Sequence, residues 1–344
     1  MNKKKLILLL SALLLILASV LVHSYYSKIY KPNTVKEGYL YIPTDANYDE
    51  VQNLIRPFIK RIKPLNWVAN RKNYPSKIKA GRYLIDKGMS NNDLINLLRS
   101  GNQKALKLAF NNQDSLEKLA GRIAEQIEAD SLSILTELKE PSFLAKNNFD
   151  IQTALAMYIP NSYEFYWNTS ASKFKQRMLK EYHRFWNSQR KEKAKKQGLS
   201  AIEVNTLASI VQKETAAISE RPEVAQLYLN RLNNRWPLQA DPTVIFCIKA
   251  LKGQETVIKR VLLKDLEIVS PYNTYKNAGL PPGPIGMPDI SAIDAVLNPT
   301  KHDYFYMCAN IDTPGKHVFA KTLSQHNRNA AKYQQWLNRQ GVHR

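Results

Sequence analysis

A glutamate stands where a helix of this chain is expected to bury its apolar face. Leu207, Ile210 and Val211 recur at the spacing of one helix face, and the next position on that face is Glu214. A Ser-x-x-Glu capping box at Ser200 marks the start of this helix. Removing a carboxyl group from water raises its pKa, which suits a general acid near neutral pH. A structural ion pair between Glu214 and a basic residue at the helix end is an equally good interpretation.

The loops that follow this helix are rich in glycine, proline, asparagine and tyrosine. Such loops are too polar to form a core, and their prolines restrict the backbone conformation. Loops of this kind typically line a site on a rigid scaffold. Their amides, hydroxyls and rings suit a polyhydroxylated, N-acetylated ligand better than a phosphate. No glycine-rich phosphate loop, His or Cys metal spacing, or Gly-x-Ser-x-Gly elbow is present. The sequence therefore points to a saccharide ligand and to no metal.

The N-terminal third reads as an alternation of strands and helices. Residues 39–42 are strand-like and are echoed by residues 81–85, while apolar residues between 51 and 62 recur at the spacing of one helix face. In this pattern Ser90 is the expected N-cap of a helix, and Gly101 is expected to end the same helix. Together with the helix that carries Glu214, these patterns predict an α+β fold.

The start of the chain is expected to anchor it in a membrane. Lys3, Lys4 and Lys5 precede an apolar run, residues 6–22, that is long enough to span a bilayer. We favour an uncleaved transmembrane helix at 6–24 over a cleaved signal peptide, because no small-x-small cleavage site follows the run. The leading lysines place the short N-terminus, residues 1–5, in the cytoplasm and the rest of the chain outside it.

The composition bounds the class of protein. The 344 residues carry a formal net charge of +21, which is typical of proteins that bind nucleic acid or an anionic membrane surface. Because the N-terminus directs the chain out of the cytoplasm, we expect no nucleic-acid partner. Cys247 and Cys308 are the only cysteines, so a disulfide framework is excluded. They either pair with each other or remain buried thiols.

Several spaced motifs, all in one order, resemble the endolytic murein transglycosylase family of the YceG-like type. The resemblance is close over about 130 residues. The motifs are Leu207–Thr215, Glu220–Pro222, Asn230–Leu232, Leu238–Ile245, Pro271–Tyr275, Gly279–Ile285, Asn298–Pro299, His317–Phe319 and His326–Asn327.

The resemblance implies an endolytic lytic transglycosylase, a carbon-oxygen lyase that acts on peptidoglycan. It implies cleavage of the β-1,4 bond between N-acetylmuramic acid and N-acetylglucosamine, a 1,6-anhydromuramoyl product, and no metal or cofactor. The catalytic glutamate of the family corresponds to Glu214, which would serve as both acid and base. The family usually has a second glutamate where this sequence has Gln212, and an amide cannot donate the proton.

The resemblance also assigns further residues. Those expected to hold the sugars and orient the glutamate are Thr215, Gln239, Asp241, Thr243, Tyr272, Asn273 and Tyr275. Each of them could instead keep a loop in shape, and for Asp241, which precedes a proline, a turn-forming role is as good an interpretation.

The expected organisation is an anchor followed by three extracytoplasmic parts on the outer face of the cell (inner) membrane. These parts are a LysM-like α/β subdomain at 34–105, an intermediate region at 106–198 and a mixed α+β catalytic domain at 199–344. Peptidoglycan strands are the expected substrate, peptidoglycan synthases are candidate partners, and termination of nascent strands is the expected outcome. The alternative is a non-catalytic membrane protein that binds or scaffolds peptidoglycan through its LysM-like part.

Overall fold

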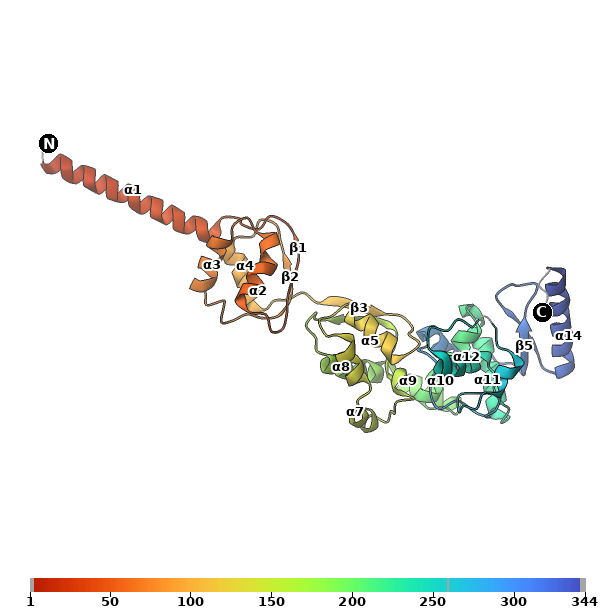
Figure 1. Ribbon diagram of the computed structural model, residues 1–344. Helices are drawn as coiled ribbons and strands as arrows, with labels where there is room; N and C mark the ends of the chain where they lie inside the picture. The colour runs from red at the N-terminus through yellow and green to blue at the C-terminus, as the bar shows by residue number, and fades with distance from the viewer. Residues whose placement is uncertain (1–2, 259, 341–344) are drawn as a thin grey trace. The chain divides into compact units, whose positions relative to one another are not determined.

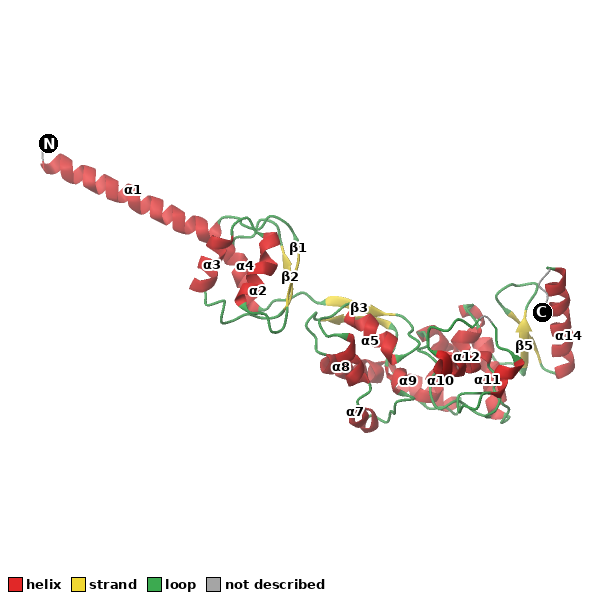
Figure 2. Ribbon diagram, viewed as in Figure 1, coloured by secondary structure: helices red, strands yellow, loops and turns green. Residues whose placement is uncertain are grey.

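The computed structural model describes residues 3–258 and 260–340. The chain forms two compact units (Figure 1). The first unit contains the chain up to Leu108 together with residues 126–129 and 163–170. The second unit contains residues 109–125 and 130–162 and the chain from Ala171 onward. Figure 2 shows short strands among a majority of helices, so the expected mixture of helices and strands is confirmed.

The first unit begins with a long apolar helix, α1. It runs from Lys3 to Tyr30, and its apolar side chains are exposed on all sides. At about 1.5 Å per residue it is roughly 42 Å long, more than the roughly 30 Å of a bilayer's hydrocarbon core. Among the described residues it is the one helix long and apolar enough to span a membrane. Its last turns belong to the folded unit, because Tyr25 packs edge-on against Trp67 with ring centroids 5.0 Å apart.

Two antiparallel strands and three helices complete the first unit. The strands pair from Gly38 opposite Ile85 to Ile42 opposite Gly81, so the sequence echo is a strand pair. The apolar core lies between this pair and the helices. The elements are β1 (Gly38–Ile42), α2 (Tyr48–Ile55), the 3-10 turn η1 (Arg56–Phe58), α3 (Ile62–Arg71), β2 (Gly81–Ile85) and α4 (Asn91–Ser100).

The structure confirms one of these helix predictions and corrects another. Helix α4 has Ser90 as its N-cap and the left-handed Gly101 as its C-cap, as the sequence predicted. The single helix face expected over residues 51–62 is wrong. Helix α2 ends at Ile55, and Pro57 lies in η1. Proline has no N–H for the helical ladder and its ring clashes with the preceding turn, so the helix breaks there.

The second unit is mainly helical. Strands β3 and β4 form a two-stranded sheet, the boundary between the units falls within both strands, and β5 pairs with β6 antiparallel. The strands are β3 (Leu106–Phe110), β4 (Asn161–Phe165), β5 (Tyr306–Ala309) and β6 (His317–Ala320). The helices are α5 (Leu116–Ala124), α6 (Ser131–Leu138), α7 (Pro141–Lys146), α8 (Ala171–Phe185), α9 (Ser188–Lys196), α10 (Ala201–Glu214), α11 (Arg221–Asn233), α12 (Asp241–Lys252), α13 (Ile290–Leu297) and α14 (Leu323–Arg339). The 3-10 turns are η2 (Ala154–Met157), η3 (Ile218–Glu220) and η4 (Leu263–Glu267).

Helix α10 lies at the centre of this unit. It packs against α11, α12 and α13, and all residues from Val204 to Val211 are buried. The capping box of Ser200 and Glu203 is present at its start. Because three helices surround α10, its C-terminal end has a fixed position among them. That end carries Glu214.

Candidate active site

Glu214 is the last residue of α10, and its side chain is only partly exposed. The residues before it on the same face, Leu207, Ile210 and Val211, are fully buried, as the helical spacing predicted. Thr215 caps the helix in an extended conformation. The C-terminal end of a helix carries a partial negative charge, which disfavours an ionised carboxylate there. Position and burial therefore both favour the protonated form of Glu214.

A tyrosine from the next helix is the hydrogen-bond partner of this carboxyl group. The hydroxyl of Tyr228, which is buried in α11, donates to Oε1 of Glu214 at 2.8 Å. Burial raises the pKa of Glu214 from 4.5 to about 7, and nearby Asp241 adds to the rise. The Tyr228 hydrogen bond and the charges of His317 and Arg231 act in the opposite direction. Glu214 therefore exchanges its proton near neutral pH, as a group that is first acid and then base must do.

A second carboxylate and a second tyrosine lie beside the first pair. Asp241 is the first residue of α12, and its Oδ1 accepts a hydrogen bond from the Tyr275 hydroxyl at 2.6 Å. Burial, and then this bond to Asp241, raise the pKa of Tyr275. Asp241 is close enough for its charge to raise the pKa of Glu214, and Tyr275 likewise raises the pKa of Tyr228. Asp241 and Tyr275, both predicted from the sequence, therefore lie at the site.

Arg231 is close to this group, yet it forms no ion pair with Glu214 among the described residues. Its Nε donates to the carbonyl of Phe305 at 2.8 Å, and a guanidinium NH donates to the carbonyl of Leu238. Burial lowers the pKa of Arg231, and the neighbouring Tyr228 and Glu214 oppose that change. Arg231 therefore ties α11 to two loops and leaves the Glu214 carboxyl free of a salt bridge. The alternative interpretation of Glu214 as half of a structural ion pair is not supported.

A second glutamate, six residues after Glu214, has a different environment. Glu220 is 3% exposed and accepts two hydrogen bonds from His317, one from the backbone N–H at 2.5 Å and one from Nδ1 at 3.0 Å. His317 begins β6, so this contact fixes the β5–β6 hairpin to the start of α11. The contact also places the His317 charge where it acts on Glu214.

Two hydrogen bonds join the loop before α13 to α10. The Ser209 hydroxyl accepts from the N–H of Ile285 at 3.0 Å, and Oε1 of Gln212 accepts from the N–H of Asp289 at 2.5 Å. An amide oxygen is sufficient for the second contact, so Gln212 has a positioning role that needs no acidity. Gly283 is required here, because a Cβ at this position would lie 2.2 Å from the carbonyl oxygen of Gln152.

Comparison with known proteins places this arrangement in a family. A model of the YceG-like family matches residues 40–332. The chain belongs to the YceG-like family. It is 32% identical over 310 residues to a Bacillus subtilis (strain 168) protein named endolytic murein transglycosylase, which covers 85% of this chain and 83% of the relative.

Two further relatives extend this YceG-like comparison. A protein of the same name from Streptococcus pneumoniae (strain D39) is 29% identical over 328 residues. That match covers 85% of this chain, which spans 57% of the longer streptococcal protein. The crystal structure of a YceG-like protein from Listeria monocytogenes superposes with a TM-score of 0.54 at 27% identity, covering 85% of this chain and 98% of the other.

Three of the residues expected to hold substrate in this YceG-like chain use their side chains for hydrogen bonds within the protein, and a fourth is exposed. The Thr215 hydroxyl accepts from the N–H of Ala217 at 3.1 Å. The Thr243 hydroxyl lies 2.8 Å from that of Thr274, and both are buried. Asn273 is fully buried and donates to two backbone carbonyls. Gln239 is exposed and has a left-handed backbone with φ of 49°. Within the described residues, no hydrogen bond joins these four to Glu214.

Tyr272 lies elsewhere in the YceG-like unit. Its ring packs against Phe246 with centroids 4.6 Å apart, and burial raises the pKa of its hydroxyl to about 12. Both residues line a pocket of about 270 Å³. The two cysteines are both free thiols. Among residues 3–258 and 260–340, no three His, Cys, Asp or Glu side chains are grouped so that they could hold a metal ion.

Sequence reasoning assigned no role to Tyr228, Arg231, Glu220 or His317. The last three lie in matched motifs, which was the only signal available for them. Tyr228 follows Glu214 by 14 residues, but they are on different helices, so no helical periodicity relates them. Only the packing of α11 on α10 brings the tyrosine to the carboxyl group.

Proposed function

We propose that this protein is an endolytic lytic transglycosylase of peptidoglycan, with Glu214 as its catalytic acid and base. The observation that carries the proposal is a carboxyl group with a pKa of about 7 that is hydrogen-bonded to a tyrosine and, among the described residues, to no cation. The names of the Bacillus and Streptococcus relatives support murein as the substrate.

The proposed reaction cleaves the β-1,4 bond between N-acetylmuramic acid and N-acetylglucosamine. Glu214 donates its proton to the glycosidic oxygen, and the bond from that oxygen to the anomeric carbon breaks. The resulting carboxylate accepts the proton of the muramoyl 6-hydroxyl, whose oxygen bonds to the same anomeric carbon. The products are a 1,6-anhydromuramoyl end and a free 4-hydroxyl, and no water is consumed. Ordinary glycosidases divide these roles between two carboxylates.

The neighbouring residues support a single glutamate that changes role. Asp241 favours the protonated state before bond cleavage, whereas the hydrogen bond from Tyr228 stabilises the carboxylate afterwards. Asp241 is itself held by Tyr275, which keeps it oriented as the nearby negative charge. Thr215, Gln239, Thr243 and Asn273 act in this proposal by shaping the loops that receive the sugars.

The wider arrangement forms part of the same proposal. Helix α1 anchors the chain as a single-pass helix in the cell membrane, with residues 34–105 as a LysM-like subdomain outside the cytoplasm. The intermediate region at 106–198 and the catalytic domain at 199–344 follow on the same side. Cleavage of nascent strands there would stop their elongation.

The test is digestion of purified sacculi by the full-length chain in detergent, with mass spectrometry of the new glycan ends. We expect anhydromuramoyl ends from the wild type and none from Glu214→Gln. Glu192→Gln is the matched control, because Glu192 is exposed on α9 and forms a surface ion pair with Lys196. A wild type that binds sacculi but forms no new ends would support the non-catalytic scaffold instead.

A further inference from the structure

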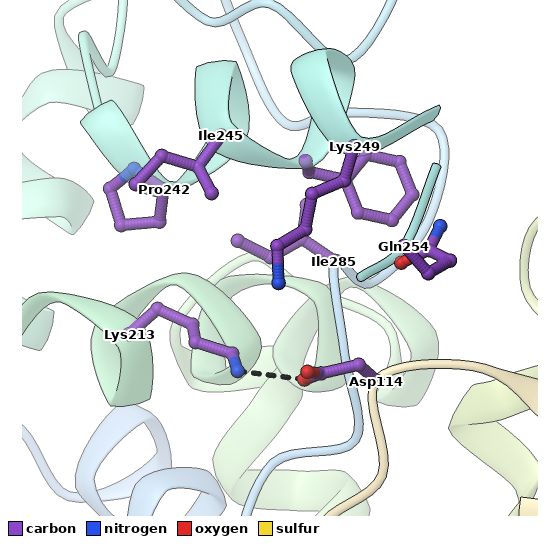
Figure 3. A pocket seen from close by; sticks show the side chains of 8 residues that line it. Asp114, Lys213, Pro242, Ile245, Lys249, Gln254 and Ile285 are labelled. Atoms are coloured by element: carbon purple, nitrogen blue, oxygen red, sulfur yellow. Dashed lines mark hydrogen bonds and ion pairs between the residues drawn. The ribbon is translucent and has the colours of Figure 1, made fainter. Parts of the chain in front are cut away.

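A small pocket is lined by residues of the two helices that carry Glu214 and Asp241. Its volume is about 120 Å³, and its walls come from α12, the end of α10 and three loops (Figure 3). The space is too small for a saccharide, since ligand pockets typically measure about 300–1,000 Å³. It has room for a group the size of one amino acid. The lining residues are Asp114, Lys213, Pro242, Ile245, Phe246, Lys249, Gln254 and Ile285.

The charged side chains that line this pocket carry a net positive charge. Nζ of Lys213 is paired with Oδ1 of Asp114 at 2.7 Å. Lys249 reaches into the pocket from α12, on the side that faces this ion pair (Figure 3). Within the described part of the chain, Lys249 has no hydrogen-bond or ion-pair partner. Two lysines and one aspartate leave one positive charge unmatched beside apolar walls, which favours an anionic ligand with an aliphatic part.

Asp114 does not neutralise the second lysine, because its carboxylate is already paired with Lys213. Burial would raise its pKa, but the hydrogen bond and charge of Lys213, with the charges of Lys249 and Lys118, hold the pKa below its usual value. The carboxylate is therefore ionised and already engaged with Lys213. Lys118 is paired with Glu255, so the ammonium group of Lys249 is the one available to a ligand.

The pocket is one residue away from the proposed site along two helices. Lys213 directly precedes Glu214, and Pro242 directly follows Asp241. Consecutive Cα atoms are about 3.8 Å apart, so the backbone that lines the pocket runs directly into the backbone that carries Glu214 and Asp241. Gly286 lies close to the Asp114–Lys213 ion pair, because a Cβ there would lie 3.3 Å from Oδ1 of Asp114 and 3.6 Å from Cε of Lys213.

A second pocket extends the first. It measures about 270 Å³ and shares Asp114, Phe246 and Gln254 with the smaller one. Its walls include Tyr272, whose ring is tilted against Phe246, and the amide-bearing Gln152. A small charged pocket that shares residues with a larger, mainly apolar and aromatic one suits a short peptide that ends in, or carries, a carboxylate.

We propose that this pocket binds a carboxylate of the murein peptide stem, with Lys249 as its cationic anchor. The inference rests on the proposed function, because the stem is attached to the same muramoyl residue that Glu214 would act on. Binding of the stem would then determine which muramoyl residue is presented to Glu214. Lys249 is a specificity-determining residue in this scheme and takes no part in proton transfer.

The test compares two substrates. One is glycan strands that carry their peptides, and the other is the same strands stripped of peptides by an amidase. For Lys249→Met we expect KM to rise about tenfold or more on the peptide-bearing strands, which corresponds to a lost hydrogen bond to a charged group. On stripped strands KM should equal that of the wild type, and kcat should be unchanged on both.

Matched variants separate charge from folding. Lys252→Met changes a lysine one turn further along α12, where it is exposed and outside the pocket, and should leave both KM values unchanged. Lys249→Arg keeps the charge and should retain most of the preference for peptide-bearing strands. An equal effect of Lys249→Met on both substrates, or no effect on either, would overturn the inference. If the wild type forms no anhydromuramoyl ends on either substrate, the proposed function itself has failed.

Discussion

Two glutamates at the ends of one short turn have opposite surroundings. Glu214 ends α10 with a tyrosine hydroxyl as its only hydrogen-bond donor among the residues that the structure describes, whereas Glu220, just before α11, accepts two hydrogen bonds from His317. Glu220 is buried and Glu214 is partly buried, but within the described part of the chain only Glu220 has a basic partner in direct contact. Burial without such a partner produces a group that keeps its proton near neutral pH, and burial with one produces a structural contact.

The largest expected effect is on Glu214. Replacing it by Gln preserves size and the acceptor for Tyr228 but removes the transferable proton. We expect kcat on peptidoglycan to fall by about 10³-fold or more, within the range for loss of a general acid and base. The measurement is the rate of anhydromuramoyl end formation. Retention of more than a tenth of the activity by a folded variant would remove Glu214 from this role.

The same substitution should stabilise the protein in alkaline buffer. A pKa raised from 4.5 to about 7 means that the folded chain holds its proton where the unfolded chain has lost it. That advantage is complete below pH 4.5 and disappears as the pH rises to 7, at a cost of up to about 3 kcal/mol. Glu214→Gln avoids this cost.

Urea unfolding at two pH values measures this difference. At pH 8 we expect the variant to have the larger free energy of unfolding, and at pH 4.5 we expect the two proteins to be equal. A wild type that is the more stable protein at pH 8 would contradict the assigned pKa.

Glu220→Gln should act mainly on stability. The amide keeps one acceptor for His317 but loses the charge, so we expect a loss of about 1–3 kcal/mol, the cost of disturbing a buried hydrogen bond to a charged group. Because Glu220 touches no reacting atom in this scheme, kcat should stay within about tenfold of the wild type, less than a single general acid supplies. The measurements are urea unfolding at neutral pH and the cleavage rate. A loss of activity equal to that of Glu214→Gln would show that the two glutamates work together.

Tyr228→Phe has the smallest expected effect. The hydroxyl lowers the pKa of Glu214, so its removal should move the alkaline limb of the pH–rate profile upward, by at most about one pH unit for a single hydrogen bond. The profile of kcat/KM against pH is the measurement. Tyr166→Phe is the matched control, because Tyr166 is 53% exposed and belongs to the first unit, whereas Glu214 belongs to the second. A downward shift in Tyr228→Phe would contradict the assigned contact.

The parts of the site that depend on residue spacing within one helix could be predicted from the sequence. The capping box at Ser200, the buried face of α10 and the place of Glu214 on it all follow from periodicity within one helix. The contacts of Tyr228 and His317 could not be predicted, since they depend on how α11 and β6 pack against α10. Proline explains the one incorrect helix, because the apolar period continues through residue 57 while the backbone cannot.

The pocket around Lys249 could not be predicted from the sequence for the same reason, because it depends on tertiary packing. Lys213, Lys249 and Asp114 come from three separate segments and show no pattern in the sequence. Their charges meet only once α12 lies against the end of α10. The motif residue Tyr272 was expected to contact the sugars, and the structure places it in the neighbouring pocket with Phe246.

The most direct measurement is digestion of peptidoglycan in water enriched in oxygen-18, with mass spectrometry of every new glycan end. If Glu214 passes its proton to the leaving oxygen and takes another from the muramoyl 6-hydroxyl, each new end is an anhydromuramoyl residue without the heavy isotope. Reducing ends that carry one oxygen-18 atom would show that water is the nucleophile and would contradict a single glutamate acting as both acid and base.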